Sequence, residues 1–192
     1  MFYPALRLRR LRNNQTIRDM VCETSFSLSN LIMPYFVIAG ENKKNAIGSM
    51  PGIYRYSIDL LVEEVKKYSA LGVKAVILFG VGEEKDDVAS RAYAEDGLIP
   101  NAVTALKNAL PEVFVITDVC LCEYTSHGHC GLVLNDCIDN DKTIELLGAS
   151  ALAHVRAGAD MVAPSDMMDG RVGYIRQALD EECFTNIPIL SY

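Results

Sequence analysis

The sequence predicts an α/β fold with a parallel sheet. Short apolar, β-branched runs alternate along its 192 residues with segments whose apolar side chains recur at helical spacing. Four helical segments separate five apolar runs, which is typical of β–α–β units. A closed barrel of eight such units typically needs ~250 residues. The pattern therefore fits either a small open sheet or a little over half of a barrel.

The first strand is expected at residues 31–38, where Pro34 requires a strand end or an edge position. Ser57 is placed to cap the helix that follows, and Gly72 is placed to end it. Residues 73–79 form the second apolar run. The polar loop at 80–97 is long enough to be functional.

The second half of the chain repeats the alternation. A helix is expected with Pro100 near its start, then a third strand at 113–117. A helix at about 142–157 precedes the fourth strand at 160–163. Asp169 is predicted to cap the last helix, and a fifth strand begins at 187–191.

Charge and hydropathy exclude two classes of partner. A net charge of −7 argues against nucleic-acid binding, and no apolar run approaches the ~18 residues of a membrane span. Residues 1–18 nevertheless carry five arginines and no acid, as in a transit peptide or in an arm that docks on an acidic neighbouring subunit. The six cysteines fit a reducing cytosol and metal binding better than disulfides.

Three of those cysteines lie within thirteen residues, directly after the third strand. Cys120, Cys122 and Cys130 could be deprotonated together by one cation, for which zinc is the usual choice. A site with three protein ligands leaves one position for water or substrate, which is the catalytic pattern. His127 or His129 could instead supply a fourth ligand, or could face the substrate. His154 is expected to be exposed or hydrogen-bonded on its helix.

Polar residues follow three strands at the same sheet edge. Asp118 ends the third strand, Ser165 and Asp166 follow the fourth, and Ser191 and Tyr192 end the fifth. In an α/β barrel that edge carries the active site. A carboxylate such as Asp118 beside a metal loop can act as acid, base or orienting group. By contrast, Gly80-Val-Gly82 lacks the further glycines of a phosphate loop.

Four segments resemble porphobilinogen synthase, also called 5-aminolevulinate dehydratase. The zinc loop of that family is similar to Asp118-Val-Cys-Leu-Cys-Glu-Tyr-Thr-Ser-His-Gly-His-Cys-Gly131 almost letter for letter. A second motif resembles Val162-Ala-Pro-Ser-Asp-Met-Met-Asp-Gly-Arg-Val172. The N-terminal arm and the start of the fifth-strand motif resemble Arg9-Arg-Leu-Arg12 with Ile17-Arg-Asp-Met20, and Pro188-Ile-Leu-Ser-Tyr192.

The resemblance implies a (β/α)₈ TIM barrel, here cut after about the fifth strand: an arm at 1–27, then strands one to five and helices one to four at 28–192. It implies a hydro-lyase that condenses two 5-aminolevulinate molecules to porphobilinogen, with loss of two waters, in tetrapyrrole and heme synthesis. Cys120, Cys122 and Cys130 would bind zinc. Asp118 would support catalysis at a substrate site formed with Ser165, Asp166 and Tyr192.

The resemblance also implies partners and a location. The arm would join copies in a homo-oligomer, commonly an octamer, and the enzyme would be cytoplasmic unless the arginines mark an organellar transit peptide. Some family members use magnesium in place of zinc, and allosteric magnesium ligands are expected outside these residues. The two Schiff-base lysines are also expected beyond Tyr192, the first three residues on, so the 192 residues are expected to be inactive alone.

Two other interpretations stay open. The chain could be a truncated, non-enzymatic homologue that binds zinc or inserts into full-length subunits as a regulator. It could also be an unrelated metal-dependent aldolase barrel, in which case both long motif matches would be coincidental.

Overall fold

The structure is a computed structural model that describes residues 2–82 and 84–192. Contacts divide the chain into a first unit ending at Asn30 and a second unit, Leu31–Tyr192. The first unit contains short helices without a buried residue: η1 (Leu8–Arg12), α1 (Gln15–Met20) and η2 (Leu28–Asn30). None of the described helices combines the length and apolar character needed to cross a membrane.

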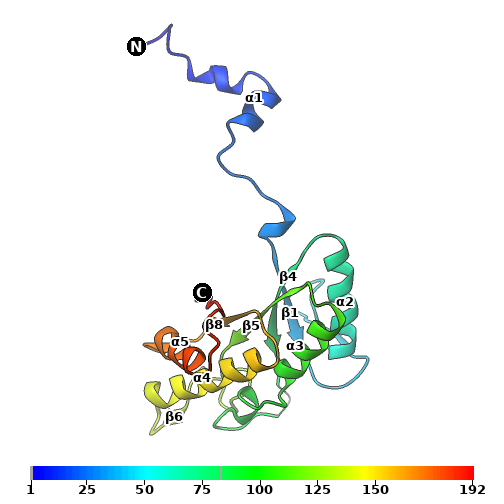
Figure 1. Ribbon diagram of the computed structural model, residues 1–192, viewed down its shortest axis with the longest axis vertical. Coiled ribbons are helices and arrows are strands. Elements are labelled where there is room, and N and C mark those ends of the chain that lie inside the picture. The colour runs from blue at the N-terminus through cyan, green and yellow to red at the C-terminus, as the bar shows by residue number, and fades with distance from the viewer. Residues whose placement is uncertain (1, 83) are drawn as a thin grey trace. The chain divides into compact units, whose positions relative to one another are not determined.

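The second unit is a mostly parallel sheet covered by helices (Figure 1). The strands are β1 (Ile32–Val37), β2 (Lys44–Ala46), β3 (Tyr54–Tyr56), β4 (Ala75–Gly80), β5 (Phe114–Val119) and β8 (Met161–Pro164), in the spatial order β2-β3-β1-β4-β5-β8. The helices are α2 (Ile58–Ala70), α3 (Leu98–Ala109), α4 (Asn140–Arg156) and α5 (Arg171–Glu181). A separate hairpin joins β6 (Val133–Leu134) to β7 (Cys137–Ile138).

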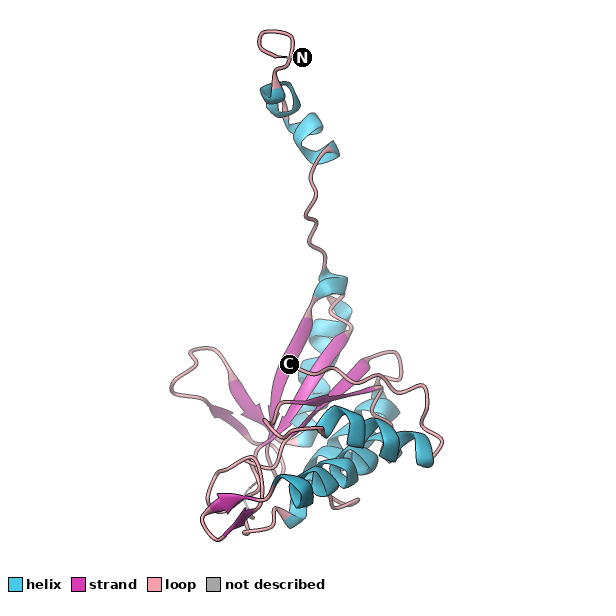
Figure 2. Ribbon diagram, turned by 90° about the vertical axis from the view of Figure 1, so that its left-hand side faces the viewer, coloured by secondary structure: helices cyan, strands magenta, loops and turns pink. Residues whose placement is uncertain are grey.

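The two faces of the sheet have different neighbours because side chains alternate along each strand. On β4, Val76 and Leu78 pack with residues of α2 and α3 in the main core cluster. Ile77, between them, packs on the other face with Ile116 and Ala163 of the neighbouring strands. Figure 2 shows the helices gathered against one side of the sheet. An all-helical outer layer and a small apolar inner cluster are what a barrel wall requires.

The predicted α/β class with a parallel sheet is confirmed, and strands formed where four of the five were expected. The fifth forms only a single bridge within the described residues, from Ile189 to Val162 of β8. Barrel closure therefore stays a prediction. At the other end, Pro34 has a partner only in β4, because β3 pairs no earlier than Phe36.

Of the three predicted helix-end residues, Ser57 and Gly72 stand where they were expected and Asp169 does not. Gly72, with φ of +106°, follows α2 as predicted. Ser57 stands at the N-cap of α2, but its hydroxyl donates to the Lys43 carbonyl instead of capping the helix. The prediction that Asp169 caps α5 was wrong: Gly170 holds that place with φ of +78°, a conformation that glycine adopts readily. The Asp169 amide donates to the Asn140 side chain at 2.8 Å.

Two hairpins were not predicted. Strands β2 and β3 pair antiparallel at the edge of the sheet, and β6 and β7 lie within the segment that follows Cys130. Each strand has only two or three residues, which is too short for an alternating pattern to be recognised.

Candidate metal centre and active site

Strands β5 and β8 bring the candidate residues to one edge of the sheet. The two strands are parallel, with Asp118 opposite Ala163 and Val119 opposite Pro164. The chain then turns into the cysteine loop after β5 and into Ser165 after β8. The carboxyl ends of these neighbouring parallel strands therefore bring both motifs side by side, which is the arrangement expected from the sequence.

The three cysteines form one cluster. Their sulfur atoms all lie within 4.8 Å of one another, and the Sγ atoms of Cys120 and Cys122 are 3.4 Å apart. Cys120 is buried, whereas Cys122 and Cys130 are half-buried. Tetrahedral zinc with Zn–S bonds of about 2.3 Å needs sulfurs about 3.8 Å apart. The donor set and its spacing thus fit a zinc ion, which Cys120, Cys122 and Cys130 would hold with three thiolates.

The contact between the sulfurs of Cys120 and Cys122 shifts the pKa values of the two thiols in opposite directions. The hydrogen bond between their sulfurs raises the pKa of Cys120, to which burial adds, and the same bond lowers the pKa of Cys122. Burial raises the pKa of Cys130 to about 11. A cation that binds here must displace the remaining thiol protons.

Neither loop histidine joins the sulfurs. His127 and His129 are exposed, their rings lie 5.3 Å apart, and the His129 amide donates to His127 Nδ1 at 3.1 Å. Among residues 2–82 and 84–192, the group close enough to hold a cation consists of the three cysteines alone. The structure therefore does not support a histidine as fourth ligand.

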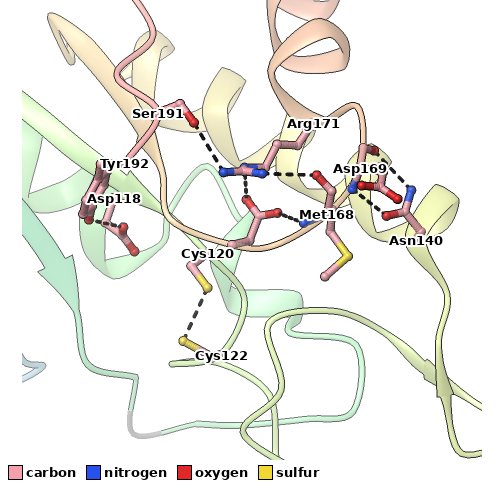
Figure 3. Close-up of polar contacts among 10 residues, drawn as sticks. Asp118, Cys120, Cys122, Asn140, Met168, Asp169, Arg171, Ser191 and Tyr192 are labelled. Atoms are coloured by element: carbon pink, nitrogen blue, oxygen red, sulfur yellow. Dashed lines mark hydrogen bonds and ion pairs between the residues drawn. The ribbon is translucent and has the colours of Figure 1, made fainter.

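Asp118, Ser165 and Tyr192 converge beside the cluster. The Tyr192 hydroxyl donates to Asp118 Oδ1 at 2.8 Å, as Figure 3 shows. Burial raises the pKa of Asp118, and hydrogen bonds from Ser165 and Tyr192 oppose that rise. Asp118 can therefore hold or release a proton closer to neutral pH than an ordinary aspartate can.

Asp166, the residue after Ser165, is buried. Its side chain has no exposed area, it accepts a hydrogen bond from the Met168 amide at 2.7 Å, and its Oδ2 lies 3.3 Å from Arg171 Nε. This last contact is an ion pair without aligned hydrogen-bond geometry. Burial raises the pKa of Asp166 and the guanidinium opposes the rise.

Arg171 is a residue that the sequence analysis did not single out. Its guanidinium also contacts the Met168 carbonyl and the Ser191 hydroxyl, each at 3.3 Å (Figure 3). It thus links the turn after β8 to the segment that carries Tyr192. The signal available in sequence was an arginine five residues after an aspartate at a strand end, which does not identify the pair.

The glycine pair at Gly80 and Gly82 makes room for a tyrosine. A Cβ on Gly80 would lie 2.0 Å from the Tyr124 hydroxyl, and one on Gly82 would lie 3.0 Å from the Tyr124 ring. Tyr124 also lines a cavity of about 330 Å³ at this edge. Arg91 in that cavity pairs with Asp96 at 3.2 Å, so its charge is already matched.

Comparisons with known proteins agree with the sequence motifs. A family model described as delta-aminolevulinic acid dehydratase matches residues 5–192. Curated relatives called delta-aminolevulinic acid dehydratase include those of Bacillus subtilis, 50% identical over 97% of this chain, and Methanothermus sociabilis, 50% identical over all of it. The chain spans 57% and 60% of their respective lengths. The relative from Ruminiclostridium josui is 47% identical, and the chain covers 91% of it.

A solved structure is similar throughout the chain. The delta-aminolevulinic acid dehydratase (porphobilinogen synthase) of Toxoplasma gondii, in complex with the reaction product porphobilinogen, superimposes with a TM-score of 0.93. It is 44% identical in sequence, and the match covers 97% of this chain and 54% of that one.

Proposed function

The chain belongs to the delta-aminolevulinic acid dehydratase family, a family of lyases, and we propose that it forms the metal-holding part of a porphobilinogen synthase active site. The proposed reaction condenses two 5-aminolevulinate molecules to porphobilinogen, with loss of two waters, in tetrapyrrole and heme synthesis. The observation that carries the proposal is the meeting of three sulfurs within 4.8 Å at the strand edge that also holds Asp118.

The proposed metal is Zn²⁺, held by Cys120, Cys122 and Cys130. Three thiolates on a divalent cation give a centre of net charge −1, which suits orienting or polarising a substrate oxygen or amine. The cysteine set favours zinc over magnesium, because magnesium prefers oxygen ligands.

The side chains around the sulfurs have separate proposed roles. Asp118, hydrogen-bonded to Tyr192, exchanges a proton with the substrate, because burial brings its pKa toward neutrality. Ser165 is exposed beside it and is proposed to bind substrate together with Tyr192. Asp166 is proposed to contribute to the substrate site by fixing Arg171, since its own carboxylate has no exposed area.

The covalent step is proposed to depend on residues outside these 192. Schiff-base formation needs an uncharged, accessible amine. Lys107 cannot supply it in this structure, because its ammonium lies 2.9 Å from Asp160 and also donates to the Val113 carbonyl at the opposite end of β5. The family resemblance, in which both Schiff-base lysines are expected beyond Tyr192, is the reason that we expect no turnover from the chain alone.

Metal content and turnover test the proposal together. The purified 192-residue chain is expected to hold one zinc by elemental analysis and to lose it in Cys120→Ser, with Cys183→Ser, an exposed cysteine elsewhere, as the matched control. Incubation with 5-aminolevulinate is expected to yield no porphobilinogen. A metal-free wild-type chain would contradict the zinc site, and measurable product would contradict the expected inactivity.

A second candidate is a non-enzymatic partner that binds zinc or inserts among full-length subunits. It is motivated by the expected lack of turnover, although the curated relative of similar length is itself called delta-aminolevulinic acid dehydratase. In both candidates, the arm at 1–27 is proposed to join subunits, and the enzyme is proposed to form an octamer. The proposed location is the cytoplasm. Co-expression with a full-length homologue distinguishes them: a regulator is retained in the purified oligomer and changes its turnover.

A further inference from the structure

Thr125 is a fully buried polar side chain in the middle of the cysteine loop. Its hydroxyl donates to the His129 carbonyl at 2.9 Å and lies 3.5 Å from the Cys122 carbonyl. Its amide donates to the Leu121 carbonyl at 3.0 Å. One residue thus connects the backbone beside Cys122 to the backbone immediately before Cys130.

The long loop after β4 forms hydrogen bonds with the backbone of the same segment. The Asp86 amide donates to the Tyr124 carbonyl at 3.1 Å, and the Ser126 amide donates to the Asp86 carbonyl at 3.0 Å. These two bonds form a bridge between Asp86 and Thr125. The Ser126 hydroxyl also donates to the Asp87 carboxylate. We call these contacts of Asp86 and Asp87 the outer brace.

Hydrogen bonds within its own loop also fix the side chain of Asp86 in the outer brace. The Asp86 carboxylate accepts hydrogen bonds from the amides of Val88 and Ser90, each at 3.0 Å, and from the Ser90 hydroxyl. These bonds, with the hydroxyl first, lower the pKa of Asp86. Ala89 follows with no exposed area and φ of +53°. The hydrogen bonds of the Asp86 carboxylate and the burial of Ala89 therefore restrict the conformations that the outer brace can adopt.

We propose that Thr125, supported by the outer brace, is a positioning residue that holds the three sulfurs in metal-binding geometry. Three thiolates repel one another, so a loop that was free to open would separate them. Hydrogen bonds behind the ligands oppose that separation, as outer partners do in other metal sites. The inference rests on the proposed function, because it assumes that the cysteines bind a divalent cation.

Paired substitutions test the hydroxyl in the 192-residue chain. Thr125→Val keeps the side-chain shape and removes the donor, whereas Thr125→Ser keeps the donor. Zinc affinity is measured by competition with a chromophoric chelator, and Co²⁺ absorption reports how many thiolates bind the metal. Thr125→Val is expected to weaken zinc binding about 10–100-fold and to reduce the thiolate–cobalt absorption, with Thr125→Ser within about threefold of wild type.

The outcomes separate this inference from the proposed function. A wild-type chain that binds neither metal contradicts the proposed function. Wild-type affinity and cobalt spectrum in Thr125→Val overturn the inference, even if that variant melts at a lower temperature. If Thr125→Val does not fold, Ser126→Ala replaces it, because that side chain is exposed and belongs to the outer brace. Ser126→Ala is expected to weaken zinc binding severalfold, and unchanged affinity there overturns the inference.

Discussion

The hydroxyl of Tyr124 occupies the space that a side chain on Gly80 would need. A Cβ there would also lie 2.8 Å from Ile99 of α3, so it would be trapped between a helix and the cysteine loop. Tyr124 is 6% exposed, and its carbonyl is held by the Asp86 amide. The end of β4 therefore accepts only glycine without displacing the loop that carries the sulfurs.

Gly80→Ala is expected to lower the free energy of unfolding by about 1–3 kcal/mol, the usual cost of overpacking a closed site. Urea denaturation measures the change. Gly48→Ala is the matched control, because nothing lies within 4 Å of its added methyl, and it is expected to stay within about 0.5 kcal/mol of wild type. Equal unfolding midpoints for the two variants would contradict this prediction, because they would show that the Tyr124 side chain moves aside at no cost in stability.

At the scale of elements, α4 is fastened to β5 by a buried polar contact. His154 of α4 is 3% exposed, and its Nδ1 lies 3.1 Å from the Thr117 hydroxyl. Of the two alternatives expected for this side chain, exposed or hydrogen-bonded, the structure shows the hydrogen bond. Burial lowers the pKa of His154 to about 3. The imidazole therefore stays neutral in the folded protein and takes up a proton in the unfolded chain below pH ~6.5.

This difference makes the folded protein sensitive to acid. Because the unfolded chain binds a proton that the folded chain does not, stability falls by up to about 1.4 kcal/mol per pH unit as pH drops below ~6.5 toward the folded-state pKa. His154→Gln is expected to lose about 2 kcal/mol less than wild type between pH 6.5 and pH 5. Urea unfolding at both pH values measures this.

His127→Gln provides the control for that experiment, because His127 is exposed on the cysteine loop. It is expected to follow the wild-type pH dependence. If His154→Gln and His127→Gln lose the same free energy of unfolding between pH 6.5 and pH 5, the buried imidazole does not cause the acid sensitivity.

At the scale of the whole molecule, the first unit contrasts with the second. Its apolar side chains are exposed, including Phe2, Leu8 and Leu11, and its arginines lie among them. The core clusters lie entirely within the second unit. Within the described residues, the buried apolar core therefore belongs to the second unit, and the first unit contributes no residue to it.

Deleting residues 1–30 is expected to leave the melting temperature within about 2 °C of that of the intact chain, because no core contact is lost. Zinc content should also be unchanged. Light scattering after size-exclusion chromatography is expected to show a smaller assembly than the intact chain forms. A loss of folding on deletion would mean that the first unit stabilises the second.

The sequence by itself determined those features that depend on neighbours along the chain. Helical spacing located α2 to α5 within a few residues, because a helix buries one face at a fixed period. The cysteine cluster was predictable because its three residues lie in one short loop, where the short length of chain between them keeps them close. Its position after β5 also brought Asp118 to the functional edge.

Only the tertiary structure decided which distant residues meet and which side chains stay accessible. Asp166 looked like a surface ligand but is enclosed by Arg171, and the buried Thr125 is gripped by Asp86, thirty-nine positions earlier. Gly80 and Gly82 had no role assigned from sequence once a phosphate loop was set aside, whereas the structure shows that they make room for Tyr124. The physical reason is that periodicity records which face of an element is buried, whereas the partner on that face is selected by the packing of the whole sheet.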